Sequence, residues 1–354
     1  MPNVPTAIID VDALRHNIEI VRTRAPDSRI MAVIKANAYG HGYEILENGM
    51  SDADAFGVAR VEEAIELRQM GIRKPITVLE GFSDSEELGA LSHYNLETVF
   101  HCRYQFDRIA SLVDYPAVKG WIKIDTGMNR LGLNREEFEE VMSRGHERLD
   151  LVGIMSHFAR ADELDCDMTR RQMTCFDEMV AGYDYPVSLA NSAGILGWPE
   201  AHRDWVRPGI MLYGVSPFPS LERPADLRPA MTLLAPIIAV KEVKAGETVG
   251  YGGQWRAPRD TRIAILSIGY GDGYPRDLPS GTPVILDGQR REIVGRISMD
   301  MTCVELEQDD RVQAGGVATM WGEGLTVEEL ANRVGTIPYT LITGLTSRVK
   351  RKYC

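Results

Sequence analysis

The first stretch that could do chemistry is Met31–Gly42, where an apolar run ends in Lys35 and is followed by small residues, Tyr39 and two glycines. This order predicts a buried strand that opens into a loop at the lysine. An ammonium group at the end of a buried strand loses hydration, and such a lysine can serve as a nucleophile. The alternatives are a lysine that extends to water or one that pairs with a carboxylate.

Charged side chains also follow other apolar runs. Lys123 and Arg130 lie in the segment 123–132, and a guanidinium there can bind a carboxylate or phenolate oxygen bidentately. His157 follows a later run and could stack on a ring or hydrogen-bond to one. Each has an ordinary alternative, namely a surface arginine in a turn or a satisfied core histidine.

Two further clusters have the composition of a phosphate site. Ser192 begins a helical segment and offers a hydroxyl beside backbone N–H groups, as an ordinary helix cap also does. Arg207, Gly209 and Ile210 follow the last apolar run of the first part of the chain, where barrel proteins often bind phosphate.

The second part of the chain holds glycine-rich segments that contain Tyr251, Tyr270 and Met299. Their glycines permit close backbone approach, although hairpins with edge tyrosines have the same composition. The segments are Gly250–Trp255, Gly269–Tyr274 and Arg296–Asp300.

The composition is that of a folded protein with an acidic balance. Of 354 residues, 44% are hydrophobic and 25% charged, and the net charge of -12 argues against a nucleic-acid surface or an anionic membrane as partner. No apolar run could span a bilayer and the first residues lack a signal-peptide pattern, which predicts a cytoplasmic location. Five scattered cysteines fit reduced thiols, so no metal site is expected.

The candidate residues from Lys35 to Ile210 lie in a part of the chain where strand and helix patterns alternate. Eight apolar runs with helical patterns between them predict an α/β fold in which residues 1–225 form an N-terminal (β/α)8 barrel of the TIM type. An open doubly wound sheet is the alternative, but polar residues follow several different strands, as in barrel active sites. The runs are the strand that ends at Lys35 and residues 55–59, 76–80, 96–100, 118–125, 151–157, 186–191 and 205–212.

A second domain is predicted downstream of a proline-rich linker that contains Pro217, Pro219, Pro224 and Pro229. Residues 226–354 are expected to form a mainly β C-terminal domain with one helix at 326–334 and a solvated tail at 350–354. The predicted strands are residues 237–241, 261–268, 282–286, 292–297, 301–306 and 316–321.

Together, these motifs resemble those of the alanine racemases, in family order and across nearly the whole chain, and most closely those of γ-proteobacteria. The resemblance implies a fold type III enzyme with pyridoxal 5'-phosphate as cofactor, L- and D-alanine as substrates, and a head-to-tail homodimer with shared active sites. The segments that carry it are residues 31–42, 123–132, 156–163, 204–214, 249–255, 268–275 and 295–300.

The resemblance also implies two catalytic bases. Lys35 would carry the cofactor as a Schiff base and, once released by the substrate, would take the α-proton of D-alanine. Tyr251, from the partner subunit, would serve L-alanine from the opposite face, because inversion removes a proton from one face and delivers one to the other. The product D-alanine would supply peptidoglycan synthesis.

Other roles follow from the same resemblance. Arg130 and the backbone N–H of the partner's Met299 would bind the substrate carboxylate, and Lys123, which is carbamylated in several relatives, would orient Arg130 as an anion. The cofactor phosphate would be held by Tyr39, Ser192, Gly209 and Ile210, with Arg207 facing the pyridine nitrogen and His157 supporting the ring. The corridor that leads to the site would contain Tyr270, Asp162, Arg276 and Arg296.

Several alternatives stay open at this point. A racemase of the same fold with broad specificity, or one acting on serine or lysine, would keep every motif. A fold type III decarboxylase would require a C-terminal cysteine and aspartate pattern that has no convincing counterpart here. A barrel protein that binds pyridoxal phosphate without catalysis would lack the β domain and Tyr251. One departure from the family is Ser347, which precedes Arg348-Val349 where some relatives have a tyrosine.

Overall fold

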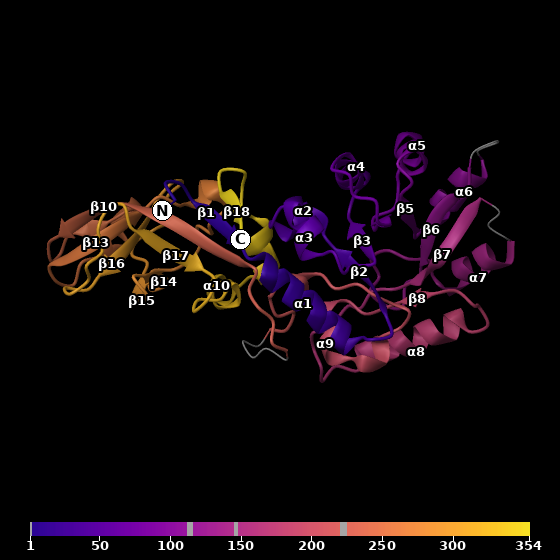
Figure 1. Ribbon diagram of the computed structural model, residues 1–354. Helices are drawn as coiled ribbons and strands as arrows, with labels where there is room; N and C mark the ends of the chain where they lie inside the picture. Colours follow the sequence, from indigo (N-terminus) through magenta and orange to yellow (C-terminus); the bar gives the residue numbers. More distant parts are fainter. Residues whose placement is uncertain (1, 112–115, 145–147, 220–224) are drawn as a thin grey trace.

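The computed structural model describes residues 2–111, 116–144, 148–219 and 225–354. Figure 1 shows an elongated molecule with a β-rich part at the left and a barrel surrounded by helices at the right. Helix α1 (Val11–Arg24) runs from one part toward the other. The predicted linker falls partly on residues 220–224, including Pro224, which lie outside the described residues.

Eight parallel strands close into a barrel in chain order, which confirms the predicted fold class. The last strand pairs with the first, so an open doubly wound sheet is excluded. Most strand residues are buried, which explains why the sequence shows apolar runs rather than alternation. The strands are β2 (Arg29–Val33), β3 (Ala55–Val58), β4 (Ile76–Val78), β5 (Glu97–Phe100), β6 (Val118–Lys123), β7 (Leu149–Met155), β8 (Val187–Ser188) and β9 (Trp205–Val206).

Short helical segments connect the barrel strands. They are α2 (Lys35–Tyr39), η1 (Tyr43–Ile45), α3 (Leu46–Gly49), α4 (Val61–Gln69), α5 (Ser85–His93), α6 (Arg103–Ala110), α7 (Arg135–Arg144), α8 (Met168–Val180), α9 (Ser192–Gly197), η2 (Pro199–Ala201) and η3 (Ile210–Tyr213).

The last two barrel strands are shorter than predicted. Strand β8 ends early because Asn191 caps α9, its Oδ1 accepting the N–H of Gly194 at 2.9 Å. Strand β9 ends at Val206 because Pro208 has no N–H to continue the ladder, and the chain then turns into η3. Both early endings leave polar groups of the following loops at the mouth of the barrel.

The first strand of the chain belongs to the second part of the molecule. Strand β1 (Thr6–Ile9) pairs antiparallel with β10 (Met231–Val243) and parallel with β18 (Lys350–Tyr353). The fully buried Ala7 is in register with Leu233, so β1 lies inside the sheet. The predicted extent of the barrel domain, residues 1–225, therefore needs a correction at its N-terminal end, while the boundary near residue 226 stays a prediction.

The expected solvated tail is also corrected by this pairing, because residues 350–353 find backbone partners in β1. The other strands of the large sheet are β13 (Thr261–Leu266), β14 (Pro283–Leu286), β15 (Gln289–Glu292), β16 (Thr302–Leu306) and β17 (Val317–Trp321). A separate two-stranded sheet consists of β11 (Thr248–Val249) and β12 (Trp255–Arg256), with η4 (Tyr251–Gly253) between them; η5 (Tyr270–Asp272) follows β13.

Helix α10 (Val327–Val334) confirms the helix predicted at 326–334, and Thr326 caps it by accepting the N–H of Glu329 at 3.2 Å. A second helix, α11 (Pro338–Thr343), was not predicted. The strand predicted at 292–297 is wrong, because Asp287 and Gly288 adopt φ values of 48° and 77° and return the chain directly into β15.

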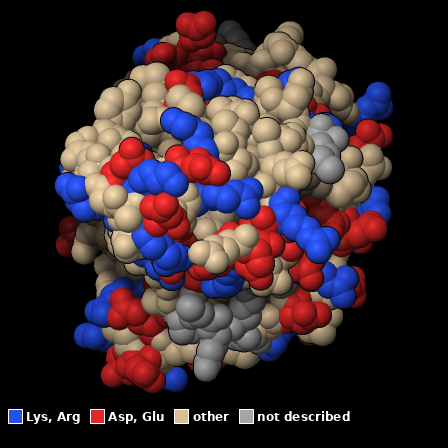
Figure 2. All heavy atoms as spheres, turned by 90° about the vertical axis from the view of Figure 1, so that its left-hand side faces the viewer, with Lys and Arg blue, Asp and Glu red and all other residues tan. Residues whose placement is uncertain are grey.

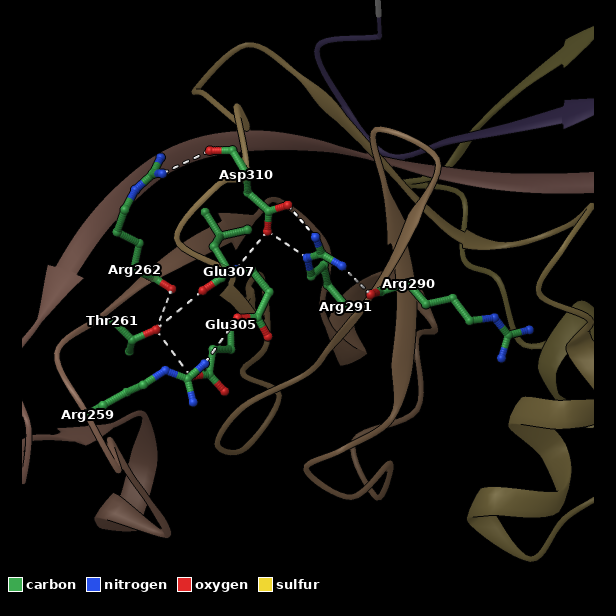
Figure 3. A network of polar contacts seen from close by, with 9 residues as sticks. Arg259, Thr261, Arg262, Arg290, Arg291, Glu305, Glu307 and Asp310 are labelled. Atoms are coloured by element: carbon green, nitrogen blue, oxygen red, sulfur yellow. Dashed lines mark hydrogen bonds and ion pairs between the residues drawn. The ribbon is translucent and has the colours of Figure 1, made fainter.

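A polar network holds the distal end of the β-rich part together (Figure 3). Arg291 donates from Nε to Asp310 at 2.6 Å, and both side chains are largely buried. The carbonyl oxygen of Asp310 accepts a hydrogen bond from Arg262 at 3.0 Å, which ties the loop after β16 to β13. On the outer face seen in Figure 2, Lys and Arg side chains lie beside Asp and Glu side chains, so neighbouring charges offset each other.

None of the helices in the described ranges is both long enough and apolar enough to cross a membrane.

Candidate active site

Lys35 lies two residues after Val33, the buried end of β2, as the sequence pattern predicts. Its side chain is exposed within the single chain, however, and not desolvated as expected. The next four residues, Ala36–Tyr39, have φ values between 51° and 54° and form one left-handed turn. Such a conformation costs roughly 1–2 kcal/mol for each non-glycine residue. Contacts from elsewhere in the fold must therefore hold this turn.

Two distant segments supply those contacts. Glu63, on α4, accepts the N–H of Ala36 at 2.7 Å. Arg351, on β18, donates from Nε to the carbonyl of Gly40 at 2.6 Å. The turn is thus fixed both from helix α4 of the barrel and from the C-terminal strand β18, and Lys35 at its start lines a cavity.

A second turn places Arg130 beside the end of β6. One oxygen of Asp125 accepts the N–H groups of residues 127, 128 and 129 at 2.9, 3.0 and 3.1 Å. Gly132 closes the turn at φ 135°, and a Cβ there would lie 2.6 Å from the backbone nitrogen of Asp125. This local geometry holds Arg130 at the same cavity as Lys123, the last residue of the strand, and close enough to affect the pKa of that lysine.

Arg207 is held in the barrel interior with only 5% of its surface exposed. Its guanidinium donates to Ser188 Oγ and to the carbonyl of Ser156, each at 2.5 Å. The same group lies 3.5 Å from Nδ1 of His157. These contacts, from β8 and from the residues that follow β7, fix the direction of the guanidinium.

The four predicted phosphate ligands gather at one place. Ser192 Oγ accepts the N–H of Gly209 at 2.9 Å, which leaves its own hydroxyl hydrogen to donate elsewhere. A Cβ on Gly209 would lie 2.6 Å from the hydroxyl of Tyr39. Ile210 begins η3, so its N–H is one of the groups for which the helix has no internal partner. Hydroxyl and N–H donors thus lie side by side.

These groups line a single cavity of about 940 Å³ at the mouth of the barrel. The site residues predicted from the sequence that line it are Lys35, Tyr39, Lys123, Arg130, His157, Asp162, Ser192, Arg207, Gly209 and Ile210.

The cavity has a surplus of positive charge. Burial, and then the neighbouring cations Arg207, Arg130 and Lys35, lower the pKa of Lys123 to about 8. Burial lowers the pKa of Arg207 to about 10. Burial and the same cations hold the pKa of His157 well below its usual range, so that its ring is neutral at pH 7. An anionic ligand would relieve this repulsion.

Five predicted site residues do not line this cavity. Tyr251, Met299 and Tyr270 are 71%, 52% and 40% exposed on loops of the β-rich part. Arg276 and Arg296 are also exposed. Within one chain, the fold therefore brings together the predicted cofactor ligands. It does not bring in Tyr251 and Met299, which the resemblance assigns to the partner subunit, or three of the four predicted corridor residues.

Sequence reasoning missed several side chains of the cavity, among them Tyr339 and His101. Tyr339, on α11, lines it and lies 6.0 Å from the ring of Tyr39, centroid to centroid. His101 lines it beside Lys123, and burial lowers its pKa. The only sequence signal for Tyr339 was Pro338 at the start of a short helix, and neither residue type at these positions indicates a site.

The chain has a closed barrel with a lysine after the first barrel strand, a cationic cavity at the barrel mouth and an attached β domain. These features are those of a β/α-barrel enzyme whose site suits an anionic ligand. Family models of the alanine racemase N-terminal and C-terminal domains match residues 9–217 and 230–353. The chain belongs to the alanine racemase family and is an isomerase.

Individual relatives agree with this assignment. The chain is 50% identical over 352 residues to an alanine racemase of the γ-proteobacterium Yersinia pestis, with 98% of each chain covered, which confirms the predicted resemblance. It superimposes on the biosynthetic alanine racemase of Pseudomonas aeruginosa with a TM-score of 0.92, 40% identity and 100% of each chain covered.

A third similar protein is the alanine racemase of Bartonella henselae, whose crystal structure contains covalently bound pyridoxal phosphate. Its TM-score is 0.93 at 30% identity, again over 100% of each chain. The alternative of a cofactor-binding barrel without a β domain does not fit this chain, because the C-terminal family model covers residues 230–353.

Proposed function

We propose that this protein is an alanine racemase that interconverts L-alanine and D-alanine with pyridoxal phosphate as its cofactor. The observation that carries the proposal is that Lys35 shares one cavity with Arg130 and Arg207. An amine that can bind an aldehyde covalently thus lies beside two guanidinium groups that can hold anionic oxygens. The covalently bound cofactor in the Bartonella henselae protein supports the same assignment.

The residues present fit this cofactor. Its phosphate would lie against the hydroxyls of Tyr39 and Ser192, the N–H of Ile210 and the backbone of Gly209, where only a glycine leaves room. The phosphate and the phenolate would offset the cationic surplus of the cavity. When bound, pyridoxal phosphate supplies an electron sink that makes the α-hydrogen of an attached amino acid acidic.

Arg207 would face the pyridine nitrogen. Its pKa of about 10 lies well above neutral pH, so the guanidinium donates a hydrogen bond to the nitrogen but does not give up its proton. Arg207 in this place would supply no proton to the nitrogen, and the ring would then take up less negative charge. This restraint would favour reprotonation at Cα over transamination or decarboxylation.

Inversion at Cα requires a base on each face. Lys35 Nζ would remove and return the proton on the D face. The hydroxyl of Tyr251 would do so on the L face, but Tyr251 is 71% exposed and does not line the cavity of its own chain. We therefore place it in the active site of a second subunit, in a head-to-tail homodimer.

The other exposed loop residues would act in the same shared site. The backbone N–H of Met299 would join Arg130 in binding the substrate carboxylate. Tyr270, Arg276 and Arg296 from one subunit would meet Asp162, which lines the cavity of the other, along the corridor for substrate.

Lys123 has a further role in this proposal. Its pKa of about 8 leaves a fraction of the amine uncharged near neutral pH, and only an uncharged amine adds to CO₂ to give a carbamate and a proton. A carbamate would place an anion beneath Arg130 and orient its guanidinium toward the cofactor phenolate and the substrate carboxylate.

The proposal is tested with purified protein, pyridoxal phosphate and L-alanine in D₂O. We expect deuterium at Cα by NMR and deuterated D-alanine by chiral chromatography, with serine and lysine turned over much more slowly. Equal or faster turnover of serine or lysine would instead identify the broad-specificity or serine/lysine racemase. Absence of exchange and inversion with all three amino acids would refute a racemase.

A racemase of this kind would supply D-alanine for peptidoglycan from the cytoplasm. Growth of an alanine-racemase-deficient, D-alanine-requiring bacterium without added D-alanine, when it expresses this chain, tests that role. Continued dependence on D-alanine, despite racemase activity in extracts of the same cells, would contradict it.

The lowered pKa of Lys123 predicts a pH-dependent stability of the cofactor-free protein. A base whose folded-state pKa lies below its unfolded value binds fewer protons when folded, so stability rises with pH between about 8 and 10.5. The Lys123 contribution is a penalty of at most about 3 kcal/mol below pH 8 that disappears above pH 10.5. We expect Lys123→Met to lack this rise in urea unfolding measured at pH 8 and pH 10 in CO₂-depleted buffer.

The matched control is Lys119→Met, which removes an exposed lysine from the same strand, β6. It should keep the pH dependence of the wild type. A wild-type slope in Lys123→Met would show that Lys123 is not the desolvated group.

A further inference from the structure

Three segments of the β-rich part contact one another, and two of them are the exposed loops that carry Tyr270 and Met299. The N–H of Tyr270 donates to the carbonyl of Ser298 at 3.1 Å, and the N–H of Gly271 donates to the carbonyl of Met299 at 2.9 Å. A Cβ on Gly269 would lie 2.2 Å from the carbonyl oxygen of Ser298, so the two loop backbones are in direct contact. The third segment, near the end of the chain, reaches both loops through Arg348.

Arg348 forms an ion pair with each loop. Its Nε lies 3.1 Å from Oδ1 of Asp272, and its Nη2 donates to Oδ1 of Asp300 at 2.7 Å. Asp272 is only 2% exposed, and its second oxygen accepts the N–H of Gly269 at 2.9 Å. A buried carboxylate requires such a partner, and the forked guanidinium can pair with two carboxylates at once.

The chain around Arg348 is itself fixed to the first loop. The N–H of Thr346 donates to the carbonyl of Asp272 at 3.1 Å, and the hydroxyl of Thr346 donates to the carbonyl of Gly271 at 3.1 Å. A Cβ on Gly271 would lie 2.6 Å from Nη1 of Arg348, so the guanidinium lies close to the loop backbone. Arg348 does not line the cavity of its own chain.

We propose that Arg348 is a positioning residue that fixes the Tyr270 loop and the Met299 loop against each other, and that it acts on the active site of the partner subunit rather than on that of its own barrel. This inference rests on the shared sites of the proposed function. Arg348 lies next to Ser347, where the chain departs from some relatives, and the ion pairs give this segment a role that does not need a tyrosine.

The first test is the Arg348→Ala dimer. Misplacing a substrate contact by about 1 Å can lower a rate roughly 100-fold. We expect kcat/KM for alanine to fall by about 10- to 100-fold, mainly through KM, because the Met299 N–H binds the substrate carboxylate. The absorbance of bound pyridoxal phosphate should not change. Amide hydrogen exchange at residues 270 and 271 should become faster, while exchange in the barrel strands stays unchanged.

Arg348→Lys provides a second variant in case the alanine variant does not fold. A single ammonium cannot hold both carboxylates in the same geometry, so an intermediate loss is expected. Arg333→Ala removes an exposed arginine of α10 in the same part of the molecule and should leave kcat and KM unchanged. Unchanged kinetics in both Arg348 variants would overturn the inference.

Purified heterodimers decide in which subunit Arg348 acts. In the pair Arg348→Ala with Lys35→Ala, the only site with a lysine receives loops from the subunit that keeps Arg348. In the pair of wild type with the Lys35→Ala/Arg348→Ala double variant, the same site receives loops that lack it. We expect the first pair to match a dimer of wild type with Lys35→Ala, and the second to be about 10- to 100-fold weaker.

The inference would be overturned if the first heterodimer were less active than the second, or if the two were equally active. A heterodimer of Tyr251→Phe with Lys35→Ala separates this failure from that of the proposed function. If that heterodimer regains activity while Arg348→Ala with Lys35→Ala does not, only the role of Arg348 is wrong. If neither regains activity, the shared active site is refuted and the inference with it.

Discussion

Replacing Lys35 with alanine is expected to abolish racemisation in both directions, with a loss in kcat of at least ~10²–10⁴-fold. The amine would be both the attachment point of the cofactor and one of the two bases, so the variant would lack both functions. The measurement is deuterium incorporation at Cα of alanine in D₂O, together with the absorbance of covalently attached pyridoxal phosphate, which should disappear.

The fold itself should survive this change. The left-handed turn is held by Glu63 and Arg351 through backbone groups, which the alanine variant retains. Loss of the Lys35 charge also removes one of the cations that repel Lys123. Lys119→Ala, an exposed lysine on β6, is the matched control and should keep full activity. Retention of the covalent cofactor signal in Lys35→Ala would refute the assignment of Lys35.

Replacing Tyr251 with phenylalanine is expected to leave the cofactor bound but to slow removal of the α-proton of L-alanine by roughly 10²–10⁴-fold. The hydroxyl is the base on that face, and the phenyl ring keeps most of the packing. Racemisation should fall equally in both directions, because the equilibrium constant between enantiomers is one. The selective effect therefore appears in exchange without inversion, where D-alanine should still acquire deuterium through Lys35.

The control for this variant is Tyr104→Phe, an exposed tyrosine on α6 of the barrel whose hydroxyl donates to the carbonyl of Ser83. It should have wild-type exchange rates with both enantiomers. Equal loss of exchange with L-alanine and D-alanine in Tyr251→Phe would contradict separate bases on the two faces. A heterodimer with Lys35→Ala should restore one complete site, because the defects then lie in different subunits.

Much of the barrel could be predicted because its information is local. A parallel strand covered on both faces must be apolar throughout, so β2 to β7 appear as short runs followed by polar residues. The ends of β8 and β9 were harder to predict from the sequence, because the cap at Asn191 and the proline at position 208 determine where these strands stop. The strand pattern predicted that polar residues meet at one mouth of the barrel, and the resemblance to the alanine racemases supplied the roles proposed for them.

The sequence by itself determined the barrel, the β-rich second part and ten residues that meet in one cavity. Only the tertiary structure decided that β1 and the last residues join the second sheet, because strand pairing depends on which edges meet in space. It also decided the left-handed turn after Lys35, whose strain of roughly 1–2 kcal/mol per residue is offset by distant partners. The position of Tyr339 at the cavity and the ion pairs of Arg348 could not be predicted for the same reason, because long-range contacts leave no local pattern in the sequence.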